Sequence, residues 1–370
     1  MQFDADTTES RHISSERESM AIDTHAHYVP AEVLHTLEES ARDFGIALHR
    51  ETPQAVPALH FDYGLKVRPF FPKLIETVEQ RLSGMAEMGV THQVLSQWTD
   101  IFGYGLPPSQ AVAWHRLMNS AYQKLCAAYP EHFSFMASVP LNSGELAAAE
   151  AAHAVQAMGA VGICVAANVD EVNLGDIALD PLWSKLQELG VPLMIHPVQA
   201  VPGSRVNKYA LTQVVQYPYD TTLAIGSLIG SGVFDRFAGL NVLLSHGGGL
   251  LPFLIGRFDR LHSRMNKQQQ HYAAENETSF YLKNLYFDTI VHSPRTLRFL
   301  AETVSTDRIV LGTDYSFPPA DMAPLSTLQA SQLSDIDRGK IANENALALF
   351  PGLKTQLRKG DAIGSPISHN

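Results

Sequence analysis

Two histidines separated by a single residue, His25 and His27, stand at the end of a short apolar run near the start of the chain. If this run is a β-strand, residues two apart point to the same side of it, so both imidazoles face one way. Two imidazoles on one side of a strand can bind a single metal ion. An H-x-H pair in a loop would carry no such meaning, so a metal site requires further ligands elsewhere in the sequence.

Three more residues with ligand-type side chains follow apolar runs further along the chain: His196, His246 and Asp314. A single histidine after an apolar strand is often a structural residue that makes one hydrogen bond. Five such side chains, all at the ends of predicted strands, instead indicate a metal site. Neutral imidazole together with carboxylate suits zinc, or manganese or iron if the coordination is more open.

The runs that carry these residues alternate with segments whose apolar residues recur at helical spacing. The expected strands are residues 20–24, 91–96, 133–139, 161–166, 191–196, 240–246, 284–288 and 308–312. The expected helices between them are residues 74–88, 109–129, 145–158, 181–189, 221–233, 252–262 and 294–303. Eight alternating units predict an α/β fold, a (β/α)8 TIM barrel, in which catalytic groups collect at the C-terminal ends of the strands. The alternative is an open doubly wound sheet, but no glycine-rich phosphate motif follows any strand.

The domain organisation follows from the same pattern. We expect the barrel to span residues 20–353, with a small insertion over about 31–72 between its first strand and its first full helix. Residues 31–50 have a helical pattern, and the rest of the insertion is rich in proline and aromatic residues; such excursions often cover a site. The polar residues 1–19 predict a disordered N-terminal arm, and residues 354–370 a C-terminal tail.

Composition excludes several classes of partner. The 370 residues are 45% hydrophobic and 18% charged, as expected for a globular protein with a large core. A net charge of -11 without any basic block argues against nucleic-acid binding. No apolar run predicts a signal peptide or a membrane span. Cys126 and Cys164 lie in apolar contexts that suit reduced thiols, so we expect a cytoplasmic protein.

The ligand-bearing segments resemble the amidohydrolase superfamily, and within it the branch that contains α-amino-β-carboxymuconate-ε-semialdehyde decarboxylase. The matching segments are Ile22–Pro30 (IDTHAHYVP), Met194–Pro197 (MIHP), Leu244–Arg257 (LSHGGGLLPFLIGR) and Leu311–Pro318 (LGTDYSFP). An H-x-H pair is shared across the superfamily. The H-G-G-G-x-x-P-F-x-x-G-R and G-T-D-Y-x-F-P patterns are far more specific to this branch.

The resemblance implies one divalent metal ion, usually zinc, held by His25, His27, His196 and Asp314, with His246 and Asp314 as catalytic residues. His246 would be the acid/base. The implied activity is non-oxidative decarboxylation of a small aromatic or conjugated unsaturated carboxylic acid, without an organic cofactor. The strand at 161–166 has no lysine that could bridge two metals, so the site is expected to be mononuclear. A hydrolase or hydratase of a small lactone or keto-acid is the alternative on the same site, and a third is a metal protein that has lost catalysis.

The substrate carboxylate requires a cation, and Arg257, eleven residues after His246, matches an arginine that the relatives use for binding and catalysis. In those relatives it enters the neighbouring subunit's site, so the resemblance implies a homodimer. The alternative is an ordinary surface arginine.

The relatives also carry an arginine on the insertion, and here the chain departs from their pattern. Residues 58–63 hold no arginine; Arg68 comes later, and His60 could take its place. Trp98 either stacks on a substrate ring or belongs to the core. Asp23 has the spacing to lie on the same side of the strand as the histidine pair, or is instead a hydrogen-bond acceptor for a ligand imidazole; Asp288 is such an acceptor or a structural residue.

Overall fold

The computed structural model describes residues 20–364 apart from 199–204, 265–266 and 269. The expected N-terminal arm, residues 1–19, and the last residues of the expected tail lie outside the described part. Within the described residues, no helix combines the length and the apolar character that crossing a bilayer requires.

Eight parallel strands form the centre of the molecule, in the order in which they occur along the chain. They are β1 (Ile22–His27), β4 (His92–Ser96), β5 (Phe133–Ser138), β6 (Gly162–Ala166), β9 (Leu193–His196), β10 (Val242–Leu244), β11 (Leu285–Asp288) and β12 (Ile309–Val310). The first and last strands meet where Thr24 N donates to Leu311 O at 2.9 Å and Ala26 pairs with Tyr315. The sheet is therefore closed, and the predicted (β/α)8 barrel is confirmed.

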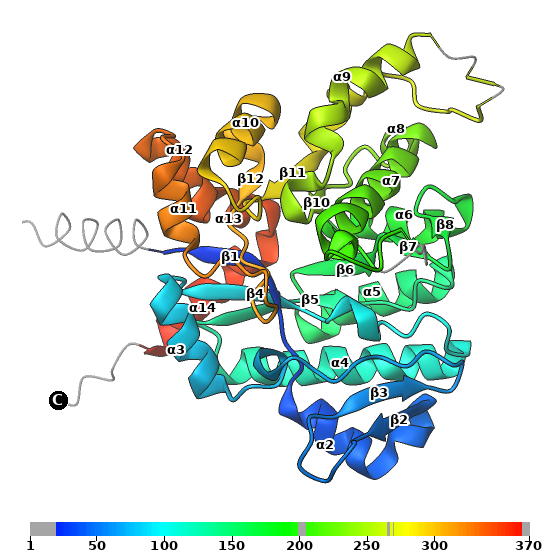
Figure 1. The fold of residues 1–370 in the computed structure, drawn as a ribbon, viewed down its shortest axis with the longest axis vertical. Coiled ribbons are helices and arrows are strands. Elements are labelled where there is room, and N and C mark those ends of the chain that lie inside the picture. The colour runs from blue at the N-terminus through cyan, green and yellow to red at the C-terminus, as the bar shows by residue number, and fades with distance from the viewer. Residues whose placement is uncertain (1–19, 199–204, 265–266, 269, 365–370) are drawn as a thin grey trace, which may run out of the picture.

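Helices surround these strands, as Figure 1 shows. They are α3 (Val78–Met88), α4 (Pro108–Ala128), α5 (Gly144–Met158), α6 (Asp180–Leu189), α7 (Tyr217–Gly230), α8 (Val233–Arg236), α9 (Leu251–His262) and α10 (Pro294–Val304). After β12 come α11 (Pro324–Ala330), α12 (Asp335–Gly339), α13 (Asn345–Leu349) and α14 (Pro351–Gly364). Helix α14 runs through residue 354, where the tail was expected to begin.

The insertion after β1 is more ordered than its sequence indicates. Helix α2 (Ala31–Ser40) ends in a short 3-10 turn, after which β2 (Ile46–His49) and β3 (Ala58–Phe61) form an antiparallel hairpin. In Figure 1 these elements lie together on the far side of α4 from the barrel strands. The expectation of helix over residues 31–50 is wrong for its last part, because Gly45 adopts a φ of 66° that ends the helical path.

Strand β1 runs further than expected, through both histidines. Its pairing with β4 is irregular between Asp23 and Ala26, so the strand is not uniformly extended where it passes the barrel mouth. Both imidazoles still converge, with His25 Nε2 and His27 Nε2 3.1 Å apart. The strand therefore delivers its two side chains to one point, as the spacing predicted.

Candidate metal centre and active site

Four predicted ligands come together at the barrel mouth. His25, His27, His196 and Asp314 each offer one ligand atom, and these atoms all lie within 4.8 Å of one another. Asp314 Oδ1 is 3.4 Å from the Nε2 atoms of both His25 and His27. The four side chains are buried, and they come from two barrel strands, β1 and β9, and the loop after β12.

Two of these atoms have no hydrogen-bond partner among the described residues: His196 Nε2 and Asp314 Oδ1. A buried nitrogen lone pair or carboxylate oxygen without a partner is costly. Both atoms point into the same cluster, where a divalent cation would satisfy them. The residues present therefore fit a single divalent metal ion, which three imidazoles and one carboxylate would hold.

The second ring nitrogen of each ligand histidine is held in place. His27 Nδ1 donates to the Gln97 carbonyl at 3.2 Å, and His196 Nδ1 donates to the Pro197 carbonyl at 2.8 Å. Since a carbonyl oxygen only accepts, the hydrogen in both rings must be on Nδ1. This tautomer leaves each Nε2 lone pair free to bind a metal.

Asp288, at the end of β11, orients the third histidine and also the turn that carries His246. Its Oδ2 accepts from His25 Nδ1 at 2.7 Å and from His246 N at 2.9 Å. Its Oδ1 accepts from Gly247 N at 2.8 Å. Of the two roles considered for Asp288, the structure shows the one that contacts a ligand imidazole.

Asp23 binds neighbouring backbone and side-chain donors rather than an imidazole nitrogen. Its carboxylate accepts from His25 N at 3.1 Å and from Thr313 N and Thr313 Oγ1 at 3.1 and 2.6 Å. It also accepts from Gln93 Nε2 at 2.9 Å. Burial raises the pKa of Asp23 to about 6. This carboxylate joins the strand that bears the histidine pair to the loop that bears Asp314.

The glycines after His246 are required by close packing. A Cβ on Gly247 would lie 2.4 Å from Val291 Cγ1, and one on Gly248 would lie 2.5 Å from Phe287. His246 itself has a φ of 54°. The chain thus turns tightly against β11, which brings the His246 ring to the metal ligands.

His246 lies beside the ligand cluster but outside the ligand set. Its Nε2 is 3.6 Å from Asp314 Oδ2, and its ring centroid is 5.3 Å from those of His25 and His196. Burial acts to raise the pKa of Asp314, but its contacts with His246 and His27 hold that pKa well below the usual range. The carboxylate therefore stays ionised and faces the His246 ring, which suits a residue that takes up and releases a proton.

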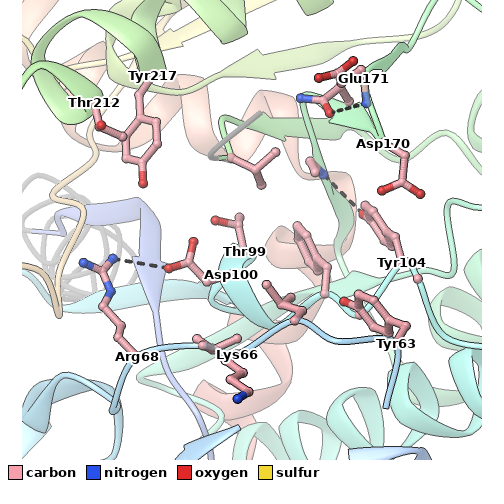
Figure 2. A pocket seen from close by; sticks show the side chains of 18 of the residues that line it. Tyr63, Lys66, Arg68, Thr99, Asp100, Tyr104, Asp170, Glu171, Thr212 and Tyr217 are labelled. Carbon is pink, nitrogen blue, oxygen red and sulfur yellow. Dashed lines mark hydrogen bonds and ion pairs between the residues drawn. The ribbon is translucent and has the colours of Figure 1, made fainter. Parts of the chain in front are cut away.

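A cavity of about 820 Å³ lies next to this cluster. It is joined to the cluster through Thr99, whose hydroxyl lies 3.3 Å from His196 Nδ1. Figure 2 shows Arg68, Asp100 and Tyr217 on one side of it, and Tyr63, Tyr104, Asp170 and Glu171 on the other. Its size is ample for a small aromatic acid.

Among the substrate-binding residues expected from the sequence, Arg68 lines this cavity. Its guanidinium lies 4.5 Å from the centroid of Phe71 and 5.6 Å from that of Trp98, and Nη2 is 3.3 Å from Asp100 Oδ2. Trp98 is 2% exposed and supports Arg68 from behind. His60 stacks on His49 in the hairpin, with ring centroids 4.6 Å apart.

Arg257 lies apart from the site of its own subunit. It is exposed on α9, and none of the described residues forms a hydrogen bond or ion pair with it. Figure 1 shows α9 extending away from the barrel strands. A single chain therefore brings together the four ligands, His246 and Arg68, but not Arg257.

The sequence matches the family described as Amidohydrolase over residues 22–352. The chain belongs to the amidohydrolase family. The resemblance expected from the four motifs is therefore confirmed, and it extends over almost the whole barrel.

Known relatives of this amidohydrolase include two decarboxylases. The 2-amino-3-carboxymuconate-6-semialdehyde decarboxylase of Dictyostelium discoideum is 31% identical over 276 residues, which cover 74% of this chain and 76% of the relative. The 6-methylsalicylic acid decarboxylase of Penicillium expansum is 30% identical over 281 residues, covering 74% and 86%. The crystal structure of dihydroxybenzoic acid decarboxylase from Polaromonas sp. JS666, with bound manganese and 2-nitroresorcinol, has a TM-score of 0.72 and 23% identity; it covers 90% of this chain and 97% of that one.

Three residues of the amidohydrolase site were not expected from the sequence: Thr99, Asp100 and Tyr217. Thr99 and Asp100 lie three and four residues after the end of β4, so the rule that the loops after barrel strands carry function could have found them. Tyr217 is the first residue of α7, and its position beside Asp100 depends on how that helix packs. No pattern in the sequence indicates it.

Proposed function

We propose that this amidohydrolase is a metal-dependent, non-oxidative decarboxylase of a small aromatic or conjugated unsaturated carboxylic acid. The observation that carries the proposal is the position of His246, whose Nε2 is 3.6 Å from Asp314 Oδ2 while the ring stays outside the set of four ligands. An acid/base beside a metal site, in a chain whose relatives at 31% and 30% identity are decarboxylases, fits this reaction.

We propose zinc as the resident ion, with manganese or iron as alternatives. Three imidazoles and one carboxylate suit zinc, whereas manganese is supported by the related structure that contains it. When bound, such an ion acts as a Lewis acid that draws electron density from a coordinated oxygen. No organic cofactor is needed for the step described next.

The chain's own residues supply the proton. In this reaction the ring carbon that bears the carboxylate gains a proton, the bond from that carbon to the carboxylate breaks, and its electron pair returns to the conjugated system as carbon dioxide leaves. His246 is placed to donate the proton, and the ionised Asp314 beside it stabilises the imidazolium form. Thr99 and Tyr217 line the adjoining cavity, where the ring would lie.

We further propose a homodimer in which Arg257 of each subunit binds the substrate carboxylate in the site of the other. Arg257 has no partner among the described residues of its own chain, and exposed apolar residues share its helix, with Phe253 81% and Leu261 46% exposed. Apolar side chains exposed beside a free arginine are typical of a surface that another subunit covers.

The remaining assignments concern binding and location. Arg68 is proposed to contact the substrate directly, with Trp98 holding it in place, whereas His60 takes this role only if Arg68 does not. The cytoplasm is proposed as the compartment, because both Cys126 and Cys164 are free thiols.

The test is direct measurement of the products. The metal-loaded protein is incubated with a panel of hydroxybenzoates and unsaturated acids in D2O while carbon dioxide and loss of acid are followed. One carbon dioxide per acid consumed, with deuterium on the carbon that lost the carboxylate, is the expected result. Uptake of water or ring opening without gas would refute the proposal and support the hydrolase or hydratase alternative.

A further inference from the structure

The cavity wall nearest to the metal ligands carries an ion pair. Arg68 Nη2 lies 3.3 Å from Asp100 Oδ2, and the side chains of the two residues are 47% and 24% exposed. Phe71 and Trp98 lie against the guanidinium. A guanidinium that is stacked and paired in this way is held in one orientation, so another carboxylate would compete with Asp100 for Nη2 of Arg68.

This pair lies close to the site of reaction. Asp100 belongs to the short 3-10 helix Thr99–Ile101, and the Thr99 hydroxyl is 3.3 Å from His196 Nδ1. Figure 2 shows the Tyr217 hydroxyl pointing to the same part of the cavity. Burial raises the pKa of Tyr217 to about 12, and the charges of Asp100 and Asp314 act on it in the same direction. Tyr217 and Asp100 therefore line the same part of the cavity as Thr99, the residue that adjoins the ligand cluster.

The charges that line the cavity do not favour a second substrate carboxylate. Two basic residues, Lys66 and Arg68, face three acidic ones, Asp100, Asp170 and Glu171, which leaves one negative charge in excess. A second carboxylate would compete with Asp100 for Arg68, and displacing Asp100 would leave its largely buried carboxylate unpaired. Both effects disfavour dianions.

We infer that Asp100 determines specificity, because it competes for Arg68 with any second carboxylate and thereby favours acids that carry one carboxylate and a hydroxyl group. The hydroxyl donates to Asp100, which accepts, while the single carboxylate is the one that is lost. The inference rests on the proposed decarboxylase function for the identity of the reacting group, but its test uses binding rather than turnover.

The test compares affinities for matched acids. Dissociation constants of the metal-loaded protein are measured by calorimetry for 2-hydroxybenzoate and for its derivatives that carry one additional carboxylate at each ring position. The parent protein is expected to bind the monocarboxylate more tightly. In Asp100→Asn the ratio should shift toward the dicarboxylates by about tenfold, through tighter dicarboxylate binding, since Arg68 becomes free to pair with them.

Two further variants separate this role from a general change in charge. Asp170→Asn removes a negative charge from the same cavity without freeing Arg68, and should shift the ratio by less than about twofold. The double variant Arg68→Met with Asp100→Asn should lose the gain. Asp100→Ala repeats the test with a different side chain, and thermal melting identifies any variant that is not folded.

The possible outcomes distinguish the role of Asp100 from the proposed decarboxylase activity. The inference would be overturned if Asp100→Asn increased the affinity for both kinds of acid equally. It would also be overturned if the increase in dicarboxylate affinity remained in the double variant with Arg68→Met, or if Asp170→Asn produced the same increase. A shift in the binding ratio without release of carbon dioxide from any acid would support the role of Asp100 and refute the decarboxylase. If the parent protein releases carbon dioxide equally fast from mono- and dicarboxylates, the decarboxylase is supported and the role of Asp100 is refuted.

Discussion

The Asp288 carboxylate binds His25 Nδ1 at 2.7 Å and, through the same oxygen, the backbone amide of His246 at 2.9 Å. One side chain thus orients a predicted metal ligand and positions the proposed acid/base beside it. The position of His246 relative to the four predicted ligands therefore depends on a residue that lies outside that set.

The first prediction concerns this carboxylate. Both Asp288 oxygens accept hydrogen bonds from the protein, Oδ2 as described above and Oδ1 from Gly247 N and Ile290 N. In Asp288→Asn the amide nitrogen must face one of these donors whichever way the group is turned. We expect a loss of roughly 10- to 100-fold in metal affinity, measured by competition with a fluorescent chelator.

Asp220→Asn is the matched control for this variant. Asp220 is also buried and accepts from Asn168 Nδ2 and Val198 N, but it contacts no metal ligand. It should keep the affinity of the parent protein. Equal losses in the two variants would show that any buried carboxylate near the barrel mouth has this effect, and would remove the specific role of Asp288.

The second prediction tests the ligand set. Asp314→Ala removes the only carboxylate among the four predicted ligands, and three neutral imidazoles alone hold a divalent ion more weakly. Elemental analysis after gel filtration should find no stoichiometric metal, whereas the parent protein retains one equivalent. A melting curve that matches the metal-free parent would show that the variant is folded. Retention of a full equivalent would contradict the assignment of Asp314.

The third prediction separates metal binding from proton transfer. His246→Ala should keep one equivalent of metal, because His246 lies outside the ligand set, and should lose turnover by roughly 10²- to 10⁴-fold because it removes the proton donor. Metal content and kcat are measured on the same sample. An unchanged kcat would exclude His246 from the mechanism, and loss of the metal would make it a ligand.

The fourth prediction concerns the proposed dimer. Arg257→Ala and His246→Ala proteins should each be inactive, since each lacks one part of every site. After subunit exchange, a hybrid dimer contains one complete site, so an equal mixture should recover about a quarter of the parent activity. Exchange is verified by mass spectrometry of differently tagged subunits.

Arg260→Ala is the control for Arg257, because Arg260 is exposed on the same helix. It should retain activity by itself. If activity does not return although hybrid dimers are present, Arg257 does not act across the interface.

The fifth prediction uses a histidine remote from the ligands. His115 is fully buried, its Nδ1 lies 2.8 Å from Ser138 Oγ, and burial lowers its pKa to about 3 from an ordinary value of 6.5. Between these two values the unfolded chain binds the proton and the folded chain does not, so the free energy of unfolding falls as the pH falls. His115 alone should account for about 2 kcal/mol of this loss at pH 5.

Urea unfolding of the metal-free protein between pH 7 and pH 4.5 measures this effect. In His115→Gln, which cannot take up a proton, the free energy of unfolding should depend less steeply on pH. His35→Gln, which replaces an exposed histidine on α2, should leave the slope unchanged. If the slopes of the parent and His115→Gln proteins are the same, His115 is not the group responsible.

Much of the barrel and the metal site could be predicted from the sequence because both depend on local pattern. Alternation of strands and helices specifies a parallel barrel, and parallel strands place their C-terminal ends at one mouth. A side chain at the end of such a strand is therefore near the others, however far apart they are in sequence. This is why His25, His27, His196, His246 and Asp314 could be grouped from the sequence, whereas their division into four ligands and one acid/base is what the resemblance to the amidohydrolases implies.

Local pattern was insufficient where contacts between distant segments decide the outcome. Residues 46–49 have the apolar spacing of a helix, yet they form β2 because Ala58–Phe61 pairs with them and because Gly45 ends the helix before them. Trp98 could equally have been a stacking residue or a core residue, and its position behind Arg68 follows from the packing of the insertion against the loop after β4.

The sequence by itself therefore determined the barrel and which residues could do chemistry, because the five ligand-type side chains stand at strand ends. The assignment of four predicted ligands and a proposed acid/base depends on the specific motifs that carry them. Only the tertiary structure decided how that chemistry is directed. It showed that Asp288 links His25 to His246, that Asp100 pairs with Arg68, and that Arg257 is exposed on α9. These residues belong to segments that are far apart in the sequence. The distances between them are set by tertiary packing, which the residue spacing within a single segment does not determine.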